Sequence, residues 1–371
     1  MSEEVYTESD SENQPKKVST VSVKCDGCGA NMVFNPDTQK LYCPHCGSEK
    51  TLDDNGTAKE LSLLEGLGKD NLYQESDGAV VFRCKNCGAN IVISDGKSAT
   101  TCPFCGTAHV EQTKDMAGLK PNGVVPFLFG IEKAIEYSKA WAKKRLFAPR
   151  KFKKNLSAEN VKGVYTPCFT FDSYTTSQYD GKIGITHTRT VGSGKNRRTE
   201  TWTEWRHIHG TFYDNFDDVL ITAGNKFDQK KLDKVSPYDT NASKEYEKQF
   251  MLGFMAYKYD IELTDCWGSA KDKMDALIRR GILKQYVYDK VAYLNVSTTH
   301  ERTTYKYVML PVYVGNFNYS KKLYNFYVNG TTGKTWGKTP KSPIRVGIAV
   351  ILGLAVAVGI GWLIYKYVIG G

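Results

Sequence analysis

The sequence is poor in cysteine and begins without a secretion signal. Ten cysteines among 371 residues are too few for a disulfide-dense secreted scaffold of this size. Residues 1–21 are polar and acidic, and they lack the apolar core of a signal peptide. With 41% hydrophobic and 24% charged residues, the composition is globular. These features exclude a disulfide-stapled secreted domain and leave room for two or three domains.

The sequence also lacks a recognisable catalytic or nucleotide-binding motif. The run Gly333-Lys-Thr imitates the end of a phosphate-binding loop, but the full pattern requires glycine where the chain has Val328. No nucleophile elbow and no Cys–His signature is present. His207 and His209 would share one strand face, but no third ligand accompanies them. We therefore expect no enzymatic activity, since an enzyme would need a pocket with converging polar groups.

Eight of the ten cysteines form two sets of four with the same spacing. In each set, fourteen residues separate two Cys-x-x-Cys pairs, and every cysteine of the first set has a counterpart 59 residues later. The run Cys-Gly-Ala-Asn repeats at the same interval, since it begins at Cys28 and again at Cys87. The repeat indicates an internal duplication. The sets are Cys25, Cys28, Cys43 and Cys46, and Cys84, Cys87, Cys102 and Cys105.

This spacing predicts two structural zinc ribbons. Each Cys-x-x-Cys turn directs two thiolates at one tetrahedral ion, and the second turn completes a four-thiolate set with no open position. A glycine after each pair permits a positive φ. Two disulfides per set and a rubredoxin-like iron site are the alternatives, and a cytoplasmic location disfavours disulfides. We expect two structural Zn²⁺ ions, which supply folding free energy that so short a unit lacks.

The remaining candidate residues near these motifs have simpler interpretations. Between the cysteine pairs lie Met32, Phe34 and Tyr42, which could pack inside the ribbon or meet a partner; packing is expected in so small a unit. His45 lies inside a cysteine pair whose ligand set is already full, so we expect it at the surface. Cys168 and Cys266 have no evident base partner and are interpreted as small buried hydrophobic residues.

Residues 346–365 form an uncharged run of twenty residues, which spans about 30 Å as a helix and matches the hydrocarbon core of a bilayer. A buried core helix is the alternative, but the run is apolar on all faces. More cations precede the run than follow it, and cations stay on the cytoplasmic side. We expect a single-pass tail anchor in the cytoplasmic membrane, with residues 1–345 in the cytoplasm. The flanking cations are Lys334, Lys338, Lys341 and Arg345 before the run and Lys366 after it.

Small residues recur every four positions within the apolar run. Such a stripe lets two membrane helices approach closely, so it predicts self-association or a membrane partner. The simpler explanation is that membrane helices are rich in glycine and alanine. The stripe consists of Ala349, Gly353, Ala357 and Gly361.

A basic run follows a predicted helix in the central region. The helix dipole explains cations in the last turn, but not those beyond Pro149. Residues 113–345 contain 39 cations and 23 anions, whereas neither ribbon has the basic stripe of a nucleic-acid reader. Anionic lipid headgroups and nucleic acid both suit the run, and the nearby membrane makes lipid at least as good an account. Its residues are Lys143, Lys144, Arg145, Arg150, Lys151, Lys153 and Lys154.

The fold class expected is multi-domain, with two small β zinc ribbons, an α+β central domain with antiparallel strands, and one C-terminal transmembrane helix. Helices are expected over residues 131–146, 243–259 and 264–281, the last with Thr264 as its N-cap. Strands are expected over residues 164–174, 183–191, 200–213, 306–316 and 322–328. The predicted segments are a disordered tail at 1–21, ribbon 1 at 22–50, an acidic linker at 51–79, ribbon 2 at 80–112, a basic domain at 113–340 and the anchor at 341–371.

Several motifs together resemble those of bacterial membrane proteins with TFIIB-type zinc ribbons, some of which are labelled primosomal-helicase-like. The resemblance covers roughly residues 22–340, and the chain departs from the family where Cys168 follows the proline in place of an aromatic residue. It implies little about activity, because the family is essentially uncharacterised and the helicase motor motifs are missing. The motifs include Cys84-Lys-Asn-Cys-Gly-Ala-Asn-Ile-Val, Ala99-Thr-Thr-Cys-Pro-Phe-Cys-Gly, Val125-Pro-Phe, Phe147-Ala-Pro-Arg-Lys-Phe-Lys-Lys, Gly163-Val-Tyr-Thr-Pro, Met251-Leu-Gly-Phe-Met-Ala-Tyr-Lys-Tyr-Asp and Asn329-Gly-Thr-Thr-Gly-Lys.

The function expected from the sequence is that of a non-enzymatic adaptor tethered to the membrane. The two ribbons would present a platform to a protein partner that the sequence does not identify, and the basic domain would lie near the inner leaflet. The alternative is a membrane-anchored nucleic-acid-binding protein, whose affinity would fall steeply with salt.

Overall fold

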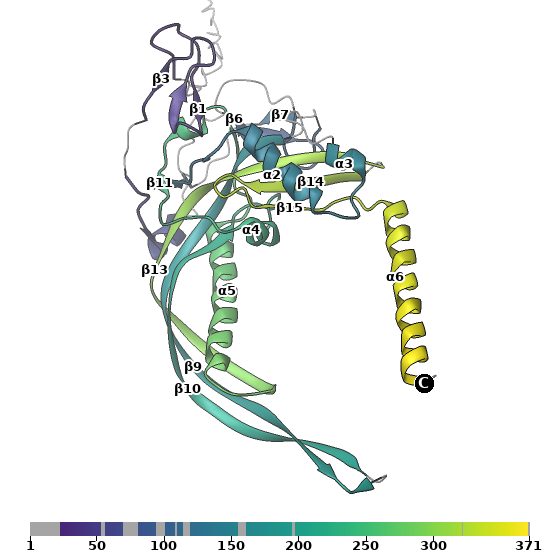
Figure 1. Ribbon diagram of the computed structural model, residues 1–371. Coiled ribbons are helices and arrows are strands. Elements are labelled where there is room, and N and C mark those ends of the chain that lie inside the picture. The colour runs from purple at the N-terminus through teal and green to yellow at the C-terminus, as the bar shows by residue number, and fades with distance from the viewer. Residues whose placement is uncertain are drawn as a thin grey trace, which may run out of the picture.

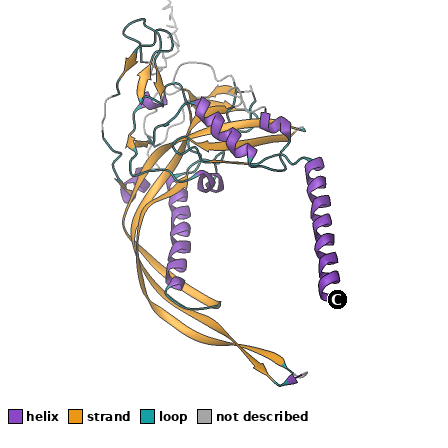
Figure 2. Cartoon of the chain, viewed as in Figure 1, coloured by secondary structure: helices purple, strands orange, loops and turns teal. Residues whose placement is uncertain are grey.

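The computed structural model describes residues 23–52, 56–69, 81–93, 101–107, 110–113, 119–154, 161–194, 197–320 and 322–369. The tail predicted at 1–21 lies outside the described residues. Within them, the chain combines helices with two β-sheets, as expected for a mixed α and β protein (Figure 2). The helices are α1 (Leu63–Lys69), α2 (Ile131–Lys143), α3 (Arg150–Lys154), α4 (Gln229–Val235), α5 (Leu263–Lys284), α6 (Pro343–Ile364), the 3₁₀ turn η3 (Lys248–Met251) and the π turn η4 (Tyr365–Ile369).

One sheet is small and the other is large. The small sheet has the order β1-β2-β3, and the large one contains twelve strands. The strands of the small sheet are β1 (Val33–Asn35), β2 (Lys40–Tyr42) and β3 (Glu49–Lys50). Those of the large sheet are β4 (Leu61–Ser62), β5 (Val81–Cys84), β6 (Asn90–Ile93), β7 (Val110–Thr113), β8 (Gly123–Val124), β9 (Val161–Val191), β10 (Arg198–Thr222), β11 (Lys244–Glu245), β12 (Met255–Tyr257), β13 (Lys290–Tyr319), β14 (Lys322–Asn329) and β15 (Thr335–Gly337).

Three very long antiparallel strands dominate the large sheet. Strands β9, β10 and β13 contain 31, 25 and 30 residues, and β9 pairs with β10 on one side and with β13 on the other. They leave the body as a curved arm, and the β9–β10 hairpin continues beyond the end of β13 (Figure 1). The separate strands predicted at 164–174 and 183–191 are therefore one continuous strand, because the intervening residues keep the extended pairing.

Helix α5 covers one face of this arm. Its buried residues recur at helical spacing, and Gly281 lies against Phe212 of β10, where a Cβ atom would meet the ring at 2.6 Å. On β9, small hydroxyl residues alternate with exposed ones, and Ser177 lies 3.0 Å from the Thr298 hydroxyl of β13. The helix predicted at 264–281 is confirmed, but it begins at Leu263 and Glu262 is its N-cap, so the Thr264 prediction is wrong.

The helix predicted at 243–259 is wrong, because that segment contains β11, η3 and β12 instead. Gly253 adopts a φ of +87°, which a continuous helix does not contain. The aromatic residues around it point into the core from several directions. Phe254, for example, stacks on Phe127 with ring centroids 4.3 Å apart. Tertiary packing of these large side chains therefore overrides the local helical pattern.

Candidate metal centres and membrane helix

The first four-cysteine set gathers at the end of the small sheet. The Sγ atoms of Cys25 and Cys46 are 3.4 Å apart, and those of Cys28 and Cys43 are 3.5 Å apart. All four Sγ atoms lie within 4.8 Å of one another. A tetrahedral zinc ion with Zn–S bonds of about 2.3 Å needs sulfur separations of about 3.8 Å, so a small relaxation suffices.

The second set has the same arrangement. The Sγ atoms of Cys84 and Cys105 are 3.6 Å apart, and those of Cys87 and Cys102 are 3.7 Å apart. These four atoms also lie within 4.8 Å of one another. The structure thus brings the eight cysteines together as two sites within metal-binding distance. Because each site consists of four thiols, its donors fit a soft or borderline cation such as zinc.

Glycine follows the second cysteine of each pair, and all four of these glycines adopt a positive φ. The backbone N–H of Gly29 donates to the carbonyl of Cys25 over 2.8 Å, and Gly88 repeats this bond with Cys84 over 2.8 Å. The φ predicted from the spacing is confirmed at each turn. The four glycines are Gly29 (+72°), Gly47 (+78°), Gly88 (+73°) and Gly106 (+70°).

Hydrogen bonding within each site lowers the pKa of some thiols and raises the pKa of others. Hydrogen bonds from Ser48 lower the pKa of Cys46 to about 6. The hydrogen bond between Cys87 and Cys102 lowers the pKa of Cys87 to about 5 and raises the pKa of Cys102. Each set therefore holds a thiolate near neutral pH, which attracts a cation.

The first ribbon docks on the body through its hairpin. The Phe34 ring lies 5.4 Å from that of Phe250, centroid to centroid, and its N–H donates to the carbonyl of Leu252 over 3.0 Å. Gln39 donates from Nε2 to the carbonyl of Phe127 over 2.7 Å. Among the described strands, the small sheet nevertheless shares no pairing with the large one. Phe34 is buried and His45 is exposed, as predicted.

The second ribbon is built into the large sheet. Its strand β6 pairs with β12, and β12 pairs in parallel with β9 at the base of the arm. Phe104 lies between two cysteines and contacts Tyr257, with ring centroids 5.1 Å apart. Asn316 and Asn325 donate to the carbonyls of Pro103 and Phe104 over 2.7 and 2.9 Å. Residues 250–258 consequently contact both ribbons, ribbon 1 through Phe250 to Phe254 and ribbon 2 through β12.

The other candidate residues do not form sites. His207 and His209 are exposed on β10, and the structure brings no third ligand to them within the described residues. Gly333 lies in the hairpin turn between β14 and β15, and Lys334 is followed by strand β15 where a phosphate-binding loop would continue into a helix. Cys168 and Cys266 are fully buried, and burial raises the pKa of Cys168. Their prediction as buried hydrophobic residues is confirmed.

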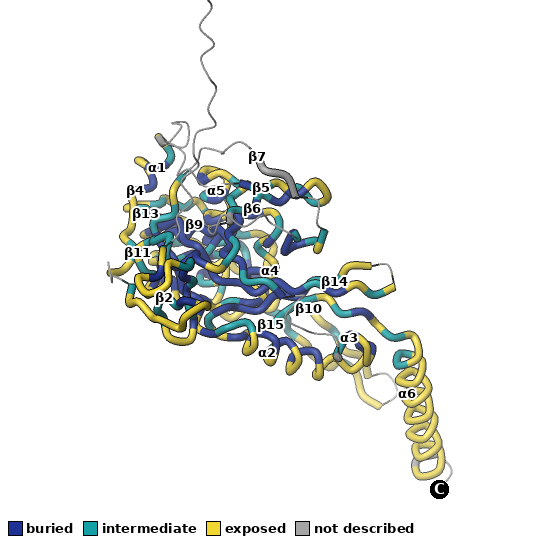
Figure 3. Tube along the Cα trace, turned by 90° about the horizontal axis from the view of Figure 1, so that it is seen from above, coloured by how far each residue is buried: buried dark blue, intermediate teal, exposed yellow. Residues whose placement is uncertain are grey.

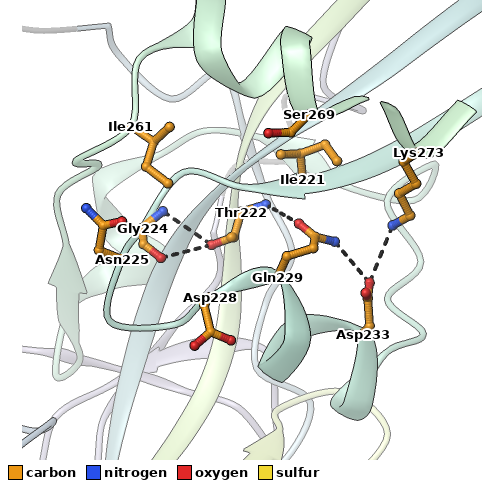
Figure 4. Close-up of a pocket in the computed structure, with 10 residues that line it drawn as sticks. All are labelled: Ile221, Thr222, Gly224, Asn225, Asp228, Gln229, Asp233, Ile261, Ser269 and Lys273. Atoms are coloured by element: carbon orange, nitrogen blue, oxygen red, sulfur yellow. Dashed lines mark hydrogen bonds and ion pairs between the residues drawn. The ribbon is translucent and has the colours of Figure 1, made fainter. Parts of the chain in front are cut away.

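A cavity of about 330 Å³ between β10, α4 and α5 has a mainly apolar surface with several polar side chains at its edge (Figure 4). Its polar groups bond to one another: Gln229 accepts from the N–H of Thr222 over 3.0 Å and donates to Asp233 over 2.9 Å, while Lys273 also reaches Asp233 at 3.4 Å. Asp228 caps the start of α4. The residues that line this cavity include no cysteine or histidine, and its Lys273 and Gln229 side chains are both bound to Asp233.

A partly buried ionic cluster, which the sequence did not reveal, ties the segment before β4 to the sheet. The Nζ atom of Lys306 lies 2.6 Å from Oε1 of Glu60 and 2.9 Å from Oδ1 of Asp218. Asp172 on β9 accepts from the N–H of Asp218 over 2.6 Å. Burial raises the pKa of Asp172. The lysine ammonium lies where a cation would bind, so the three carboxylates already have their counter-ion. In the sequence, the only hint of this cluster is that Lys306 stands beside the apolar run around Met309.

No residue of helix α6 is buried, and beyond its first turn, where Arg345 and Val346 are partly covered, the helix is exposed and stands clear of the body (Figure 3). The span from Pro343 to Tyr367 contains 25 residues with a mean hydropathy of 2.5, and none of its most apolar window is buried. The part of the chain that the structure describes thus has one helix long and apolar enough to cross a membrane. Because none of its residues is buried, the alternative of a core helix is contradicted.

The basic run lies beside the start of α6. Arg345 donates to the carbonyls of Leu146 and Ala148 over 3.0 and 2.9 Å, and the Ser342 N–H donates to the carbonyl of Phe147 over 2.8 Å. The cations at 143, 144, 145, 150 and 151 are exposed and Lys153 is half-buried, whereas the Lys154 side chain lies outside the described residues. The helical face predicted to reach Leu146 is wrong at its end, because α2 stops at Lys143 and leaves Leu146 in solvent.

The chain is similar to the uncharacterized protein YdjG of Bacillus subtilis (strain 168). The two are 28% identical over 331 residues, which cover 88% of this chain and 92% of the relative. No family model matches the chain, and no solved structure matches it. The likeness extends over most of both chains and assigns no activity, and the TFIIB-type resemblance stays a prediction.

Proposed function

We propose that the protein is a non-enzymatic adaptor held at the cytoplasmic membrane by α6, with two structural zinc ribbons that present a platform to a protein partner. The observation that carries the proposal is the joining of two four-thiol sites to one body whose chain continues into an exposed apolar helix. Four thiolates leave no open coordination position, so the sites suit structure and not catalysis. The cavity of Figure 4, with its mutually bonded polar groups, adds no support for an enzyme.

The arm sets a geometric condition on this proposal. Helix α6 and the arm leave the same side of the body in Figure 1. Near its end the arm carries exposed ion pairs, such as Arg189 with Glu200 at 2.9 Å and His187 with Glu204 at 2.9 Å. Charged groups are costly in a hydrocarbon layer, so the arm has to stay in water while α6 spans the bilayer. The spanning helix must therefore incline away from the arm.

The nucleic-acid alternative has weaker support, because the basic run borders the predicted span. Purified full-length protein in detergent should show no DNA or RNA binding that falls steeply with salt. Salt-dependent binding that disappears when Arg150 and Lys151 are changed to glutamine would favour the alternative.

A chain that ends at Lys341 is expected to lose its carbonate-resistant membrane association. The free energy gained by burying about twenty apolar residues in lipid is lost with α6. Full-length protein should stay in the membrane pellet after alkaline carbonate washing, and the shortened chain should stay in the supernatant. Protease added to right-side-out cells should leave the body of the full-length protein intact. A full-length protein extracted by carbonate would contradict the anchor.

Self-association through the small-residue stripe is expected to depend on Gly353. A leucine there would separate two closely packed helices, and no described residue outside the local helix backbone lies within 4 Å of its added Cβ. Gly353→Leu should abolish cross-linked dimers in membranes. Gly359→Leu is the matched control, since it lies off the stripe with equally open surroundings. Equal dimer yields from both variants would argue against the stripe.

The adaptor proposal itself is tested by cross-linking in intact cells. The set of proteins cross-linked to the full-length chain should change when Cys25→Ser removes the first site. The variant itself should remain in the membrane fraction. His45→Ala provides the control, because His45 is exposed beside the ligands without belonging to the four-thiol set. A profile that Cys25→Ser leaves unchanged would remove ribbon 1 from the platform.

A further inference from the structure

We propose that the corner between α2 and α3, residues 144–149, is a second membrane contact selective for anionic lipid. In this arrangement Leu146 and Phe147 insert among the lipids, and the surrounding cations bind headgroup phosphates. The inference rests on the proposed function, because it takes α6 to span the same bilayer. It goes further by giving the body its own lipid-binding surface.

The corner presents a firmly held apolar tip. Leu146 is 76% exposed and Phe147 is 41% exposed. The next residue, Ala148, is 1% exposed, and Phe152 is fully buried against Phe317 with ring centroids 5.0 Å apart. Two large apolar side chains therefore project from a backbone that is fixed on both sides. An exposed apolar tip of this kind on a charged surface is typical of a protein or membrane contact.

The side chains around the tip are cationic, and among the described residues none of these cations is paired with an acidic side chain. Lys143, Lys144, Arg150 and Lys151 are exposed around it, and the Arg145 guanidinium lies over the Trp141 ring at 5.1 Å. An apolar tip ringed by free cations complements a leaflet of anionic lipids, whose phosphates lie just above the acyl chains.

The corner also lies directly beside the first turn of the predicted membrane-spanning helix. Ser342 and Arg345, which bond to the carbonyls of residues 146–148, belong to the N-cap and first turn of α6. Ile344 in that turn is a further apolar side chain that is 76% exposed. When α6 enters the hydrocarbon layer, these hydrogen bonds hold Leu146 and Phe147 at the interface. The position favours lipid over nucleic acid, which would offer phosphates but no apolar layer for the tip.

Site-specific photocross-linking in proteoliposomes tests the proposal. Full-length protein with p-benzoylphenylalanine at Leu146 is reconstituted into vesicles of phosphatidylcholine alone or with phosphatidylglycerol. Leu64 is the control position, because it is 83% exposed on α1, far from α6 (Figure 3). We expect lipid adducts at Leu146 in the anionic vesicles and only background at Leu64.

Charge variants separate an anionic-lipid surface from general proximity to the membrane. Lys144→Gln should lower the adduct yield in anionic vesicles about fivefold, the change expected for one cation near an anionic surface. The control Lys59→Gln changes a lysine that is exposed away from the corner and should leave the yield unchanged. Equal yields in the two vesicle types, or an equal effect of both variants, would overturn the proposal.

The failure of this inference can be told apart from that of the adaptor proposal. Carbonate washing of the same vesicles reports whether α6 is inserted. An inserted α6 without adducts at Leu146 refutes the second contact and leaves the anchor intact. If short RNA or DNA duplexes prevent the lipid adducts from forming, the corner binds nucleic acid, and the second lipid contact is also refuted. An extractable α6 would refute the anchor on which both proposals rest.

Discussion

Cys84→Ser is expected to remove one of two metal ions and to loosen the base of the arm, whereas Cys25→Ser removes one ion and unfolds ribbon 1 alone. Metal binding to a four-thiolate ribbon contributes on the order of 10 kcal/mol of folding free energy. Loss of the second site releases β6, which is the hydrogen-bonded neighbour of β12. Loss of the first site releases a sheet that pairs with no other. The same chemical change should therefore have a larger effect at the second site.

Elemental analysis and hydrogen exchange can measure this difference. Elemental analysis of the full-length protein should give about two zinc ions per chain and about one in each serine variant. Backbone exchange at Ala256 should accelerate in Cys84→Ser and not in Cys25→Ser, because the bonds of β12 to β6 are lost in the former only. His45→Ala should retain both ions. Two ions retained after Cys84→Ser, or iron in place of zinc, would contradict the assignment.

The cysteine spacing predicted the two sites because it is a local rule. A Cys-x-x-Cys turn fixes its own geometry, and Gly29 and Gly88 satisfy the same requirement in both repeats. The attachment of the ribbons was not predictable in this way. It depends on residues 250–258, whose helical pattern is overridden by contacts of Phe254 and Tyr257 with partners more than 100 residues away in sequence.

The length of the strands in the arm was not predictable for the same reason. Strand-like composition was visible at both ends of β9, but its continuity depends on pairing with β13, which lies more than 100 residues further along the chain. The membrane helix was predictable because a long uncharged run needs no partner to be recognised. The apolar tip was missed for the opposite reason. Helical spacing assigns Leu146 to the buried face, and only the end of α2 at Lys143 exposes it.

The second large effect is expected at Lys306, where a methionine should lower the free energy of unfolding by about 3–5 kcal/mol near neutral pH. The Lys306 side chain is 5% exposed and that of Asp218 is 8% exposed. Burial alone would lower the pKa of Lys306, but the hydrogen bonds to Glu60 and Asp218 outweigh it and the pKa is raised. Methionine leaves three carboxylates within 4.8 Å of one another without a counter-ion.

Denaturant unfolding as a function of pH distinguishes this cluster from ordinary packing. A raised pKa means that the contribution of Lys306 is complete below its ordinary value of 10.5 and is lost as pH rises through the folded value. In Lys306→Met, the deficit should shrink on acidification, because burial raises the pKa of both Asp172 and Glu60, and their protonation removes the unpaired charge in the folded state. Lys322→Met, at an exposed strand position, should cost less than about 0.5 kcal/mol at any pH. A deficit in Lys306→Met that does not vary with pH would mean that lost packing, and not unpaired charge, destabilises the variant.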